Sequence, residues 1–216
     1  MTKRLIWLVV FIILLGVACF GALSYLHSFQ EVTIQAPKGS TITLYSGSLG
    51  EDGTSVDKNS IVMTTTDTVT KKIKKGSYVY IVDPNNDDYK DITSSIDIGS
   101  RPINIKPQLI YSDKKLSSLA LSYQGAIDSS LRVTYPVTMG SYSLGTVKAF
   151  GDGTWYGAVL KPNDTSQDTY LAVFKRDSLG EIQLVSKPPS IVISAPVYPE
   201  IPKDIVSSIN RLVSNN

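Results

Sequence analysis

The chain has 216 residues, with 21 Lys or Arg against 19 Asp or Glu, so its charge is nearly balanced. This balance argues against a nucleic-acid-binding protein, in which a basic face is expected. Residues beyond His27 include no cysteine and no histidine. They therefore lack the side chains of a disulfide, a Cys/His zinc site, a Ser-His-Asp triad and a Cys-His pair. Carboxylate chemistry and a Ser-Lys arrangement stay open, but no local motif indicates either.

Residues 5–26 form an apolar run without a formal charge. A helix of that length spans about 33 Å, enough to cross a hydrocarbon core of about 30 Å. Lys3 and Arg4 precede the run, so the positive-inside rule places the N-terminus in the cytoplasm. We therefore expect residues 1–30 to be a signal anchor with a transmembrane helix. The chain would then be a single-pass protein of the cytoplasmic membrane, with its C-terminal domains extracytoplasmic.

Cys19, the single cysteine, leaves two alternatives to an uncleaved anchor. The segment "GVAC" at 16–19 resembles a bacterial lipobox, which implies a lipoprotein tethered at Cys19. Against this resemblance, Gly16 stands where the pattern prefers Leu, and the chain stays apolar after the cysteine. "Ala22-Leu23-Ser24" also offers a weak cleavage site for a signal peptide. We favour the uncleaved anchor.

Residues 31–109 read as a series of short strands. Their apolar residues alternate with period two, which is typical of half-buried strands, and clusters of Gly, Pro, Asn and Asp separate them. The expected strands are 31–36, 40–46, 68–73, 78–82, 91–98 and 102–109. Many short strands at such spacing predict an all-β sandwich. In "KKIKK" at 71–75 we expect Ile73 inward and the lysines outward on an edge strand.

The same region resembles a known family. "VTIQAPKGSTITLYSG", followed by "KKIKKGSYVYIV" and "DITSSIDIGSRPINIKPQL", resembles a PEGA-type domain, a small prealbumin-like β-sandwich of bacterial and archaeal surfaces. The name-giving tetrapeptide of the family falls on residues 37–40, where Pro37 and Gly39 match it. The resemblance covers residues 31–109. It implies surface display and contact with proteins or the envelope, without catalysis.

Residues 110–216 show a different periodicity. Apolar residues spaced by three or four from Leu116 to Leu131 predict an amphipathic helix that begins near Ser112 or Asp113 and stops before Pro136. Four strand-like runs follow, joined by short turns, and predict an antiparallel meander with the helix on one face. These runs are 142–150, 154–162, 169–177 and 181–187.

The C-terminal end is punctuated by prolines. Those between residues 188 and 202 favour an extended strap over the sheet. Pro202 then fits the first position of a last helix, with Ile205, Ile209 and Leu212 on one face. The predicted fold class is thus an N-terminal transmembrane helix, an all-β sandwich and an α+β module of helix, four-strand meander and C-terminal helix.

A second resemblance concerns this α+β module. "TWYGAVLKP", "TYLAVFK" and "YPEIPKDIVSSIN" resemble the C-terminal modules of uncharacterised membrane-anchored envelope proteins of candidate-phylum, Saccharibacteria-like bacteria. The resemblance implies a bacterial envelope location. It carries no known activity.

Aromatic residues on adjacent predicted strands suggest a ligand platform for sugar or peptide, formed by Trp155, Tyr156, Tyr170 and Phe174. Strand alternation places Trp155 and Tyr156 on opposite faces, so at least one set belongs to the core. The acidic turn "DPNNDD" at 83–88 begins like a calcium loop. The Gly and the final Glu that an EF-hand needs are absent, which leaves weak calcium binding or a plain solvated hairpin.

Two functional classes follow. We favour a non-enzymatic envelope or surface interaction protein that binds another envelope protein, a peptide or a glycan, contacts the membrane through residues 5–26 and uses neither metal nor cofactor. The alternative is an envelope hydrolase that depends on carboxylates such as Asp128, Asp152 or Glu181, although no common spacing relates them.

Overall fold

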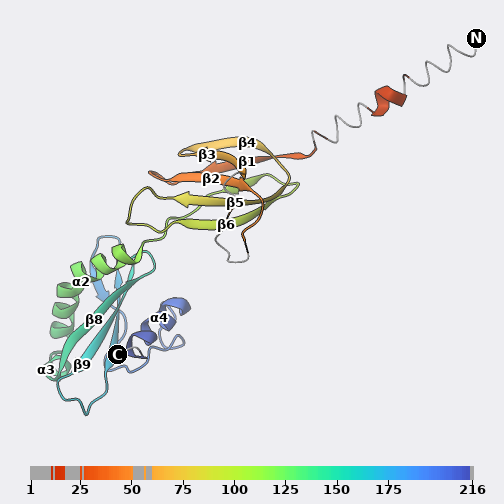
Figure 1. Cartoon of the computed structure of the whole chain (residues 1–216). Coiled ribbons are helices and arrows are strands. Elements are labelled where there is room, and N and C mark those ends of the chain that lie inside the picture. Colours follow the sequence, from red (N-terminus) through yellow and green to blue (C-terminus); the bar gives the residue numbers. More distant parts are fainter. Residues whose placement is uncertain are drawn as a thin grey trace, which may run out of the picture. The chain divides into compact units, whose positions relative to one another are not determined.

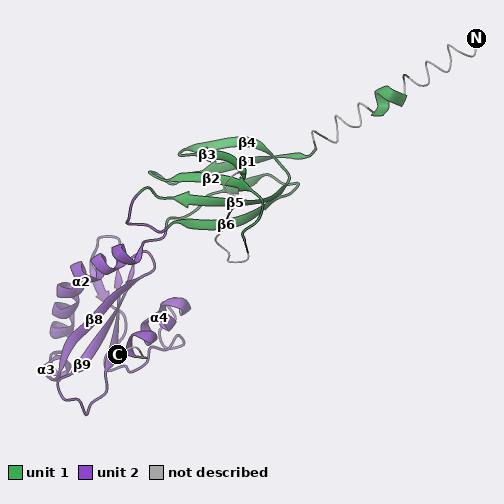
Figure 2. Ribbon diagram, viewed as in Figure 1, with its two compact units in different colours: residues 1–85, 91–109 green, residues 86–90, 110–216 purple. Residues whose placement is uncertain are grey.

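The computed structural model describes residues 11, 13–17, 25, 27–50, 56 and 60–214 (Figure 1). The chain divides into two compact units, which Figure 2 shows in different colours. The first unit comprises residues 1–85 and 91–109, and the second comprises residues 86–90 and 110–216. From the sequence alone, residues 86–90 are expected in the first of these regions, within residues 31–109.

The prediction of a transmembrane helix at residues 5–26 is overturned. Among the residues that the structure describes, no helix is long and apolar enough to cross a membrane. The single-pass anchor, the fold class that began with it and the membrane localisation derived from it are corrected accordingly. Apart from residues 11, 13–17 and 25, the segment 5–26, Cys19 included, lies outside the described residues.

The first unit is rich in β-structure and contains two sheets. One sheet has the strand order β4-β1-β7, with β1 antiparallel to β4 and parallel to β7. The other is antiparallel and has the order β3-β2-β5-β6. The strands are β1 (Phe29–Gln35), β2 (Thr41–Ser46), β3 (Ile61–Thr65), β4 (Thr68–Lys74), β5 (Gly76–Asp83), β6 (Ile92–Ile98) and β7 (Ile103–Ile105).

Both sheets of the first unit contribute to one hydrophobic core. Alternate residues of each strand point inward, as Val32 and Ile34 of β1 do, and the core draws on β1, β2, β4, β5, β6 and β7. Strand β4 lies at a sheet edge, where Ile73 is buried while Lys71 and Lys72 are exposed. Exposed lysines on an edge strand discourage pairing with other chains.

The second unit is a four-stranded antiparallel meander with the order β11-β10-β9-β8, accompanied by helices. Its elements are α2 (Asp113–Thr134), α3 (Pro136–Ser141), β8 (Tyr142–Phe150), β9 (Trp155–Pro162), β10 (Tyr170–Arg176), β11 (Ile182–Leu184) and α4 (Lys203–Ser214). Helix α2 begins at an N-cap, because the side chain of Ser112 accepts a hydrogen bond from the backbone N–H of Lys115 at 3.2 Å. Pro136 does not only end this helix; it also opens the short helix α3.

The sheet of the second unit is covered on both faces, and Figure 1 shows α2 and α4 on opposite sides of β8 and β9. One core packs Ala120, Ile127 and Leu131 of α2 against the sheet. The other packs the opposite face of the sheet against α4 and against the proline-rich strap, which contributes Ile193 and Ile201. The unit therefore has three layers, with helix α2, the sheet, and the strap together with α4.

Candidate functional site

The four aromatic residues of the predicted ligand platform do not share one exposed surface. Tyr156 and Phe174 are fully buried in the core with α2, and Trp155 is buried in the core with α4. Tyr170 is half-buried and stacks on Tyr142, with ring centroids 4.7 Å apart. The platform prediction is corrected, because strand alternation sends neighbouring rings to opposite faces and each face is covered.

The carboxylates of the alternative hydrolase lie on three separate elements. Asp128 belongs to α2, Asp152 to the β8–β9 turn, and Glu181 to the β10–β11 turn. The Oδ2 atom of Asp128 pairs with Nε of Arg132 at 2.7 Å, and Asp152 accepts a hydrogen bond from a neighbouring turn residue. Within the described parts of the chain, no group of three His, Cys, Asp or Glu side chains could hold a metal ion.

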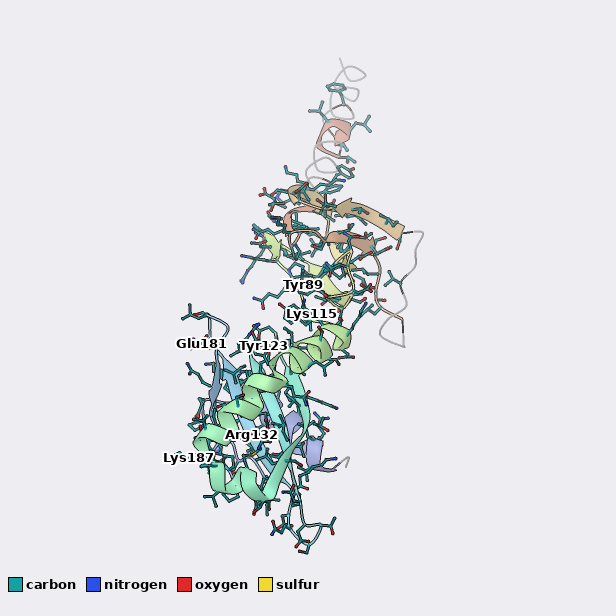
Figure 3. The ribbon with its side chains drawn as sticks, turned by 90° about the vertical axis from the view of Figure 1, so that its left-hand side faces the viewer. Tyr89, Lys115, Tyr123, Arg132, Glu181 and Lys187 are labelled. Carbon is teal, nitrogen blue, oxygen red and sulfur yellow. The ribbon has the colours of Figure 1, made fainter. Side chains whose placement is uncertain are left out.

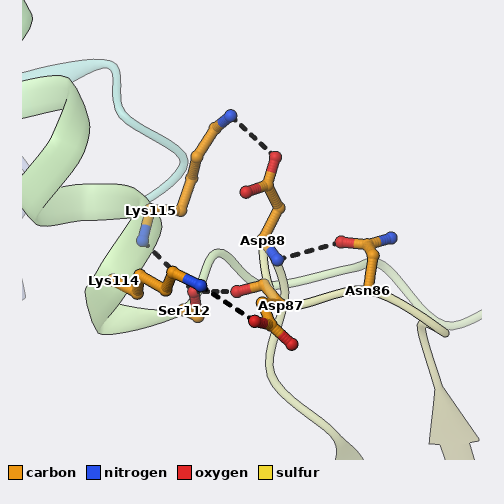
Figure 4. Close-up of polar contacts among 6 residues, drawn as sticks. All are labelled: Asn86, Asp87, Asp88, Ser112, Lys114 and Lys115. Carbon is orange, nitrogen blue, oxygen red and sulfur yellow. Dashed lines mark hydrogen bonds and ion pairs between the residues drawn. The ribbon is translucent and has the colours of Figure 1, made fainter.

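The acidic turn that resembles the start of a calcium loop is engaged with the N-terminus of α2 (Figure 4). Asp87 pairs with Lys114 at 2.8 Å and Asp88 with Lys115 at 2.7 Å. The hydroxyl of Ser112 donates to the backbone carbonyl of Asp87 at 2.5 Å. Hydrogen bonding to Lys114 lowers the pKa of Asp87. These carboxylates therefore connect residues 86–90 to the first turn of α2, within the second unit.

Strand β8 has one open edge. In the strand order β11-β10-β9-β8 it pairs only with β9, so no described strand occupies its other side. The pairing register with β9 shifts between Leu144 and Val147, which marks a bulge at Gly145 and Thr146. An edge strand presents a row of backbone N–H and C=O groups to any chain that approaches in an extended conformation.

A groove runs between this edge strand and helix α2. It consists of two adjoining cavities of about 500 Å³ and about 560 Å³, both of which border on Leu121 and Gln124. We call it the α2–β8 groove. Its other lining residues are Asp113, Leu116, Ser117, Ala120, Gly125, Asp128 and Arg132 of α2 together with Ser143, Leu144, Thr146, Val147, Lys148, Ala149 and Phe150 of β8.

The α2–β8 groove combines an apolar wall with one polar end. Leu121 is 71 % exposed, although the sequence pattern places the other leucines of α2 in the core. At the polar end, Asp128 and Arg132 form an ion pair, and Figure 3 shows Arg132 on α2. The second oxygen of Asp128, Oδ1, is buried and finds no hydrogen-bond donor among the described residues. It is an acceptor next to the groove whose hydrogen-bonding capacity is unused among the described residues.

The groove is not predicted from the sequence, although two signals of it are present there. Leu121 interrupts the polar face of the predicted helix, and Gly145 interrupts the pattern of a predicted strand, which often marks a bulge. Neither signal shows that helix and strand edge lie next to each other. That information exists only in the fold.

Comparison with known proteins gives no family assignment. No family model, no curated protein and no solved structure matches the chain. The functional interpretation of the groove therefore rests on its own residues and geometry.

Proposed function

We propose that the second unit is a peptide-binding module. An extended segment of a partner protein would add a strand to the open edge of β8 and place alternate side chains in the α2–β8 groove. One observation carries this proposal: a strand edge without a strand partner, among the described residues, borders directly on an apolar groove. Recognition by strand addition needs both features.

The open edge of β8 accounts for affinity. Backbone hydrogen bonds form with any extended segment, whatever its sequence, because every residue except proline carries one donor and one acceptor. The bulge at Gly145 and Thr146 interrupts the regular edge. The added strand would therefore pair in two short stretches, one on either side of the bulge.

The groove accounts for selectivity. In an added strand, every second side chain points to the same face and would enter the groove. Leu116, Leu121 and Val147 favour apolar side chains there. At the polar end, Oδ1 of Asp128 favours a side chain with an N–H or O–H donor, because an unsatisfied buried acceptor costs about 1–3 kcal/mol.

We propose that the first unit is a second interaction domain. Its resemblance to PEGA-type domains supports a β-sandwich that contacts other proteins and performs no catalysis. The two sheets around one core are compatible with that reading. The carboxylate hydrolase receives no comparable support, because its three carboxylates lie on separate elements.

The test uses the full-length chain and a phage-displayed library of random peptides. Enriched peptides are synthesised, and their dissociation constants are measured by calorimetry. We expect Leu121→Lys to weaken binding at least about tenfold, because it places a charge in the apolar wall. Val133→Lys is the matched control, since Val133 is also an exposed apolar residue of α2, at 83 %, but does not line the groove.

Hydrogen exchange then locates the bound peptide. The expected result is slower exchange of backbone amides in β8 when the peptide is present, with weaker protection in Leu121→Lys. Peptides that bind wild type and Leu121→Lys equally, or that protect only amides outside β8 and α2, would contradict the proposal. A library that yields no binding peptide would contradict it as well.

A further inference from the structure

Arg176 carries a charge that no carboxylate neutralises within the described part of the chain. It is the last residue of β10, and it lies two positions after the buried Phe174, on the face of the sheet that α2 covers. The side chain is half-buried, and its guanidinium carbon lies 5.8 Å from the centre of the Tyr123 ring. Figure 3 shows Tyr123 on α2. Among the residues that the structure describes, Arg176 takes part in none of the ion pairs.

The neighbouring carboxylate, Asp177, serves the turn that follows β10. Its Oδ1 atom accepts hydrogen bonds from the backbone N–H groups of Leu179 and Glu181, both at 2.9 Å. Its Oδ2 atom accepts one from Nε2 of Gln183 at 3.3 Å. These three donors stabilise the Asp177 charge within the turn, and none of the ion pairs between described residues involves the guanidinium of Arg176.

A buried hydroxyl near Arg176 has no hydrogen-bond partner among the described residues. Tyr156 is fully buried, and its hydroxyl has no hydrogen-bond partner in the described part of the chain. Its ring meets the Tyr123 ring edge to face, with centroids 5.2 Å apart. Burial raises the pKa of Tyr156 to about 12, while the nearby charge of Arg176 acts in the opposite direction. The hydroxyl is therefore a neutral donor at physiological pH.

Arg176 opens onto a cavity of about 570 Å³. The remaining lining residues are Thr154, Asp177, Ser178, Leu179 and Gly180. Leu179 is 85 % exposed and offers an apolar contact beside the charge. Gly153 lies close to Arg176, since a Cβ atom there would lie 3.7 Å from Nη2 of Arg176 and 2.6 Å from Leu119 Cδ1.

We propose that this cavity binds the carboxylate group of an acid that also carries an apolar portion, with the guanidinium of Arg176 as the primary contact. A planar guanidinium matches a carboxylate with two parallel hydrogen bonds. Asp177 in the wall disfavours a dianion such as phosphate more strongly than it disfavours a singly charged carboxylate. Leu179 is placed to contact the apolar portion. This site is separate from the α2–β8 groove and does not depend on the peptide-binding proposal.

The experiment is a titration of the ¹⁵N-labelled full-length chain, followed by NMR. The probes are sodium acetate and sodium phosphate, each against sodium chloride at equal ionic strength. We expect saturable shifts of the Arg176 Nε–H signal and of the backbone amides of residues 178–180 with acetate. Three capped peptides then separate the sources of a carboxylate: one with a free C-terminus, one amidated, and one amidated with an internal Glu. The proposal requires that at least one carboxylate-bearing peptide binds more tightly than the amidated peptide that has none.

Variants decide whether Arg176 is responsible. Arg176→Gln should weaken acetate binding at least about tenfold, and Arg176→Lys should weaken it less, because lysine keeps the charge but loses the paired donors. Lysine also keeps most of the packing on Tyr123, so its result stands even if the glutamine variant folds poorly. Arg211→Gln, which removes an exposed arginine from α4, should bind like wild type. Absence of saturable acetate shifts, equal shifts in Arg176→Gln, or tighter binding of phosphate than of acetate would overturn the proposal.

Discussion

The side chain of Asn210 in α4 makes two hydrogen bonds to the backbone of Ile193 in the proline-rich strap. Its Oδ1 atom accepts a hydrogen bond from the N–H of Ile193 at 2.8 Å, and its Nδ2 atom donates to the carbonyl oxygen of Ile193 at 2.9 Å. The Ile193 side chain is itself buried in the core with α4. One amide side chain thus supplies the donor and the acceptor that a neighbouring strand would otherwise provide.

We predict that Asn210→Ala destabilises the second unit. Truncation leaves an N–H and a C=O group without their partners in a half-buried environment, which costs about 2 kcal/mol. Urea unfolding monitored by Trp155 fluorescence, in a Trp7→Phe background, measures the change. Asn163→Ala is the control, because Asn163 makes one exposed side-chain contact at 3.3 Å. Equal losses in both variants would contradict the special role of Asn210.

We predict opposite effects of alanine at two glycines. In Gly157→Ala the new Cβ atom would lie 3.0 Å from Ile209 Cγ1 and 3.1 Å from Leu212 Cδ1, where β9 meets α4. This overpacking should lower the free energy of unfolding by about 1–3 kcal/mol. Gly125→Ala is the matched control. Its Cβ would meet nothing within 4 Å, so removal of a glycine from the interior of α2 should stabilise the unit by about 1 kcal/mol.

The same urea assay measures both glycine variants. Gly157→Ala should also disturb the packing of α4, which faster hydrogen exchange in residues 203–213 would reveal. A stable Gly157→Ala variant with unchanged exchange would show that α4 does not approach β9 as closely as the structure indicates.

We predict that Tyr156→Phe stabilises the second unit and changes its response to alkaline pH. Removal of a buried hydroxyl without a partner should raise the free energy of unfolding by about 1 kcal/mol at neutral pH. Burial raises the pKa of Tyr156 from 10.0 to about 12 in the folded state. The stability linked to this shift is complete below pH 10 and declines as the unfolded chain ionises, through pH 10 to about pH 12. Tyr156→Phe should lose less stability in that window than wild type.

Tyr142→Phe separates the two effects. Hydrogen bonding to Tyr170 raises the pKa of Tyr142 to about 12, so this variant should also decline less at alkaline pH. It loses a hydrogen bond, however, and should be less stable than wild type at neutral pH. If Tyr156→Phe were destabilised at neutral pH in the same way, the Tyr156 hydroxyl would have a partner after all.

Much of the second unit follows from its sequence, because its signals are local. Leu116 to Leu131 repeat at helical spacing, and Ser112 stands at the cap position, where the structure has it. In the first unit, strand β3 is not predicted, because its residues are mostly exposed or half-buried and Ile61 and Val62 give no alternating pattern. Helix α3 of the second unit is not predicted either, because Pro136 indicates the end of a helix, although proline also suits a first helical position.

The candidate sites were harder to predict, because they depend on which elements become neighbours. Trp155 and Tyr156 stand out in the sequence by their size, yet the fold buries them. Arg176 and Leu121 look ordinary in the sequence. Arg176 becomes a candidate because Asp177 accepts hydrogen bonds from its own turn. Leu121 becomes a candidate because β8 has an open edge beside α2.

The attachment of residues 86–90 to the start of α2 bears on how the chain can be divided. Besides the ion pairs of Asp87 and Asp88, the backbone N–H of Ser112 donates to Asp88 at 2.9 Å, and that of Lys90 donates to Ile110 at 2.8 Å. The second unit is therefore built from two separate segments of the sequence, residues 86–90 and 110–216. A fragment cut at residue 110 would lose part of its own fold, and transfer of this unit to another protein would require residues 86–90 to be carried along and rejoined.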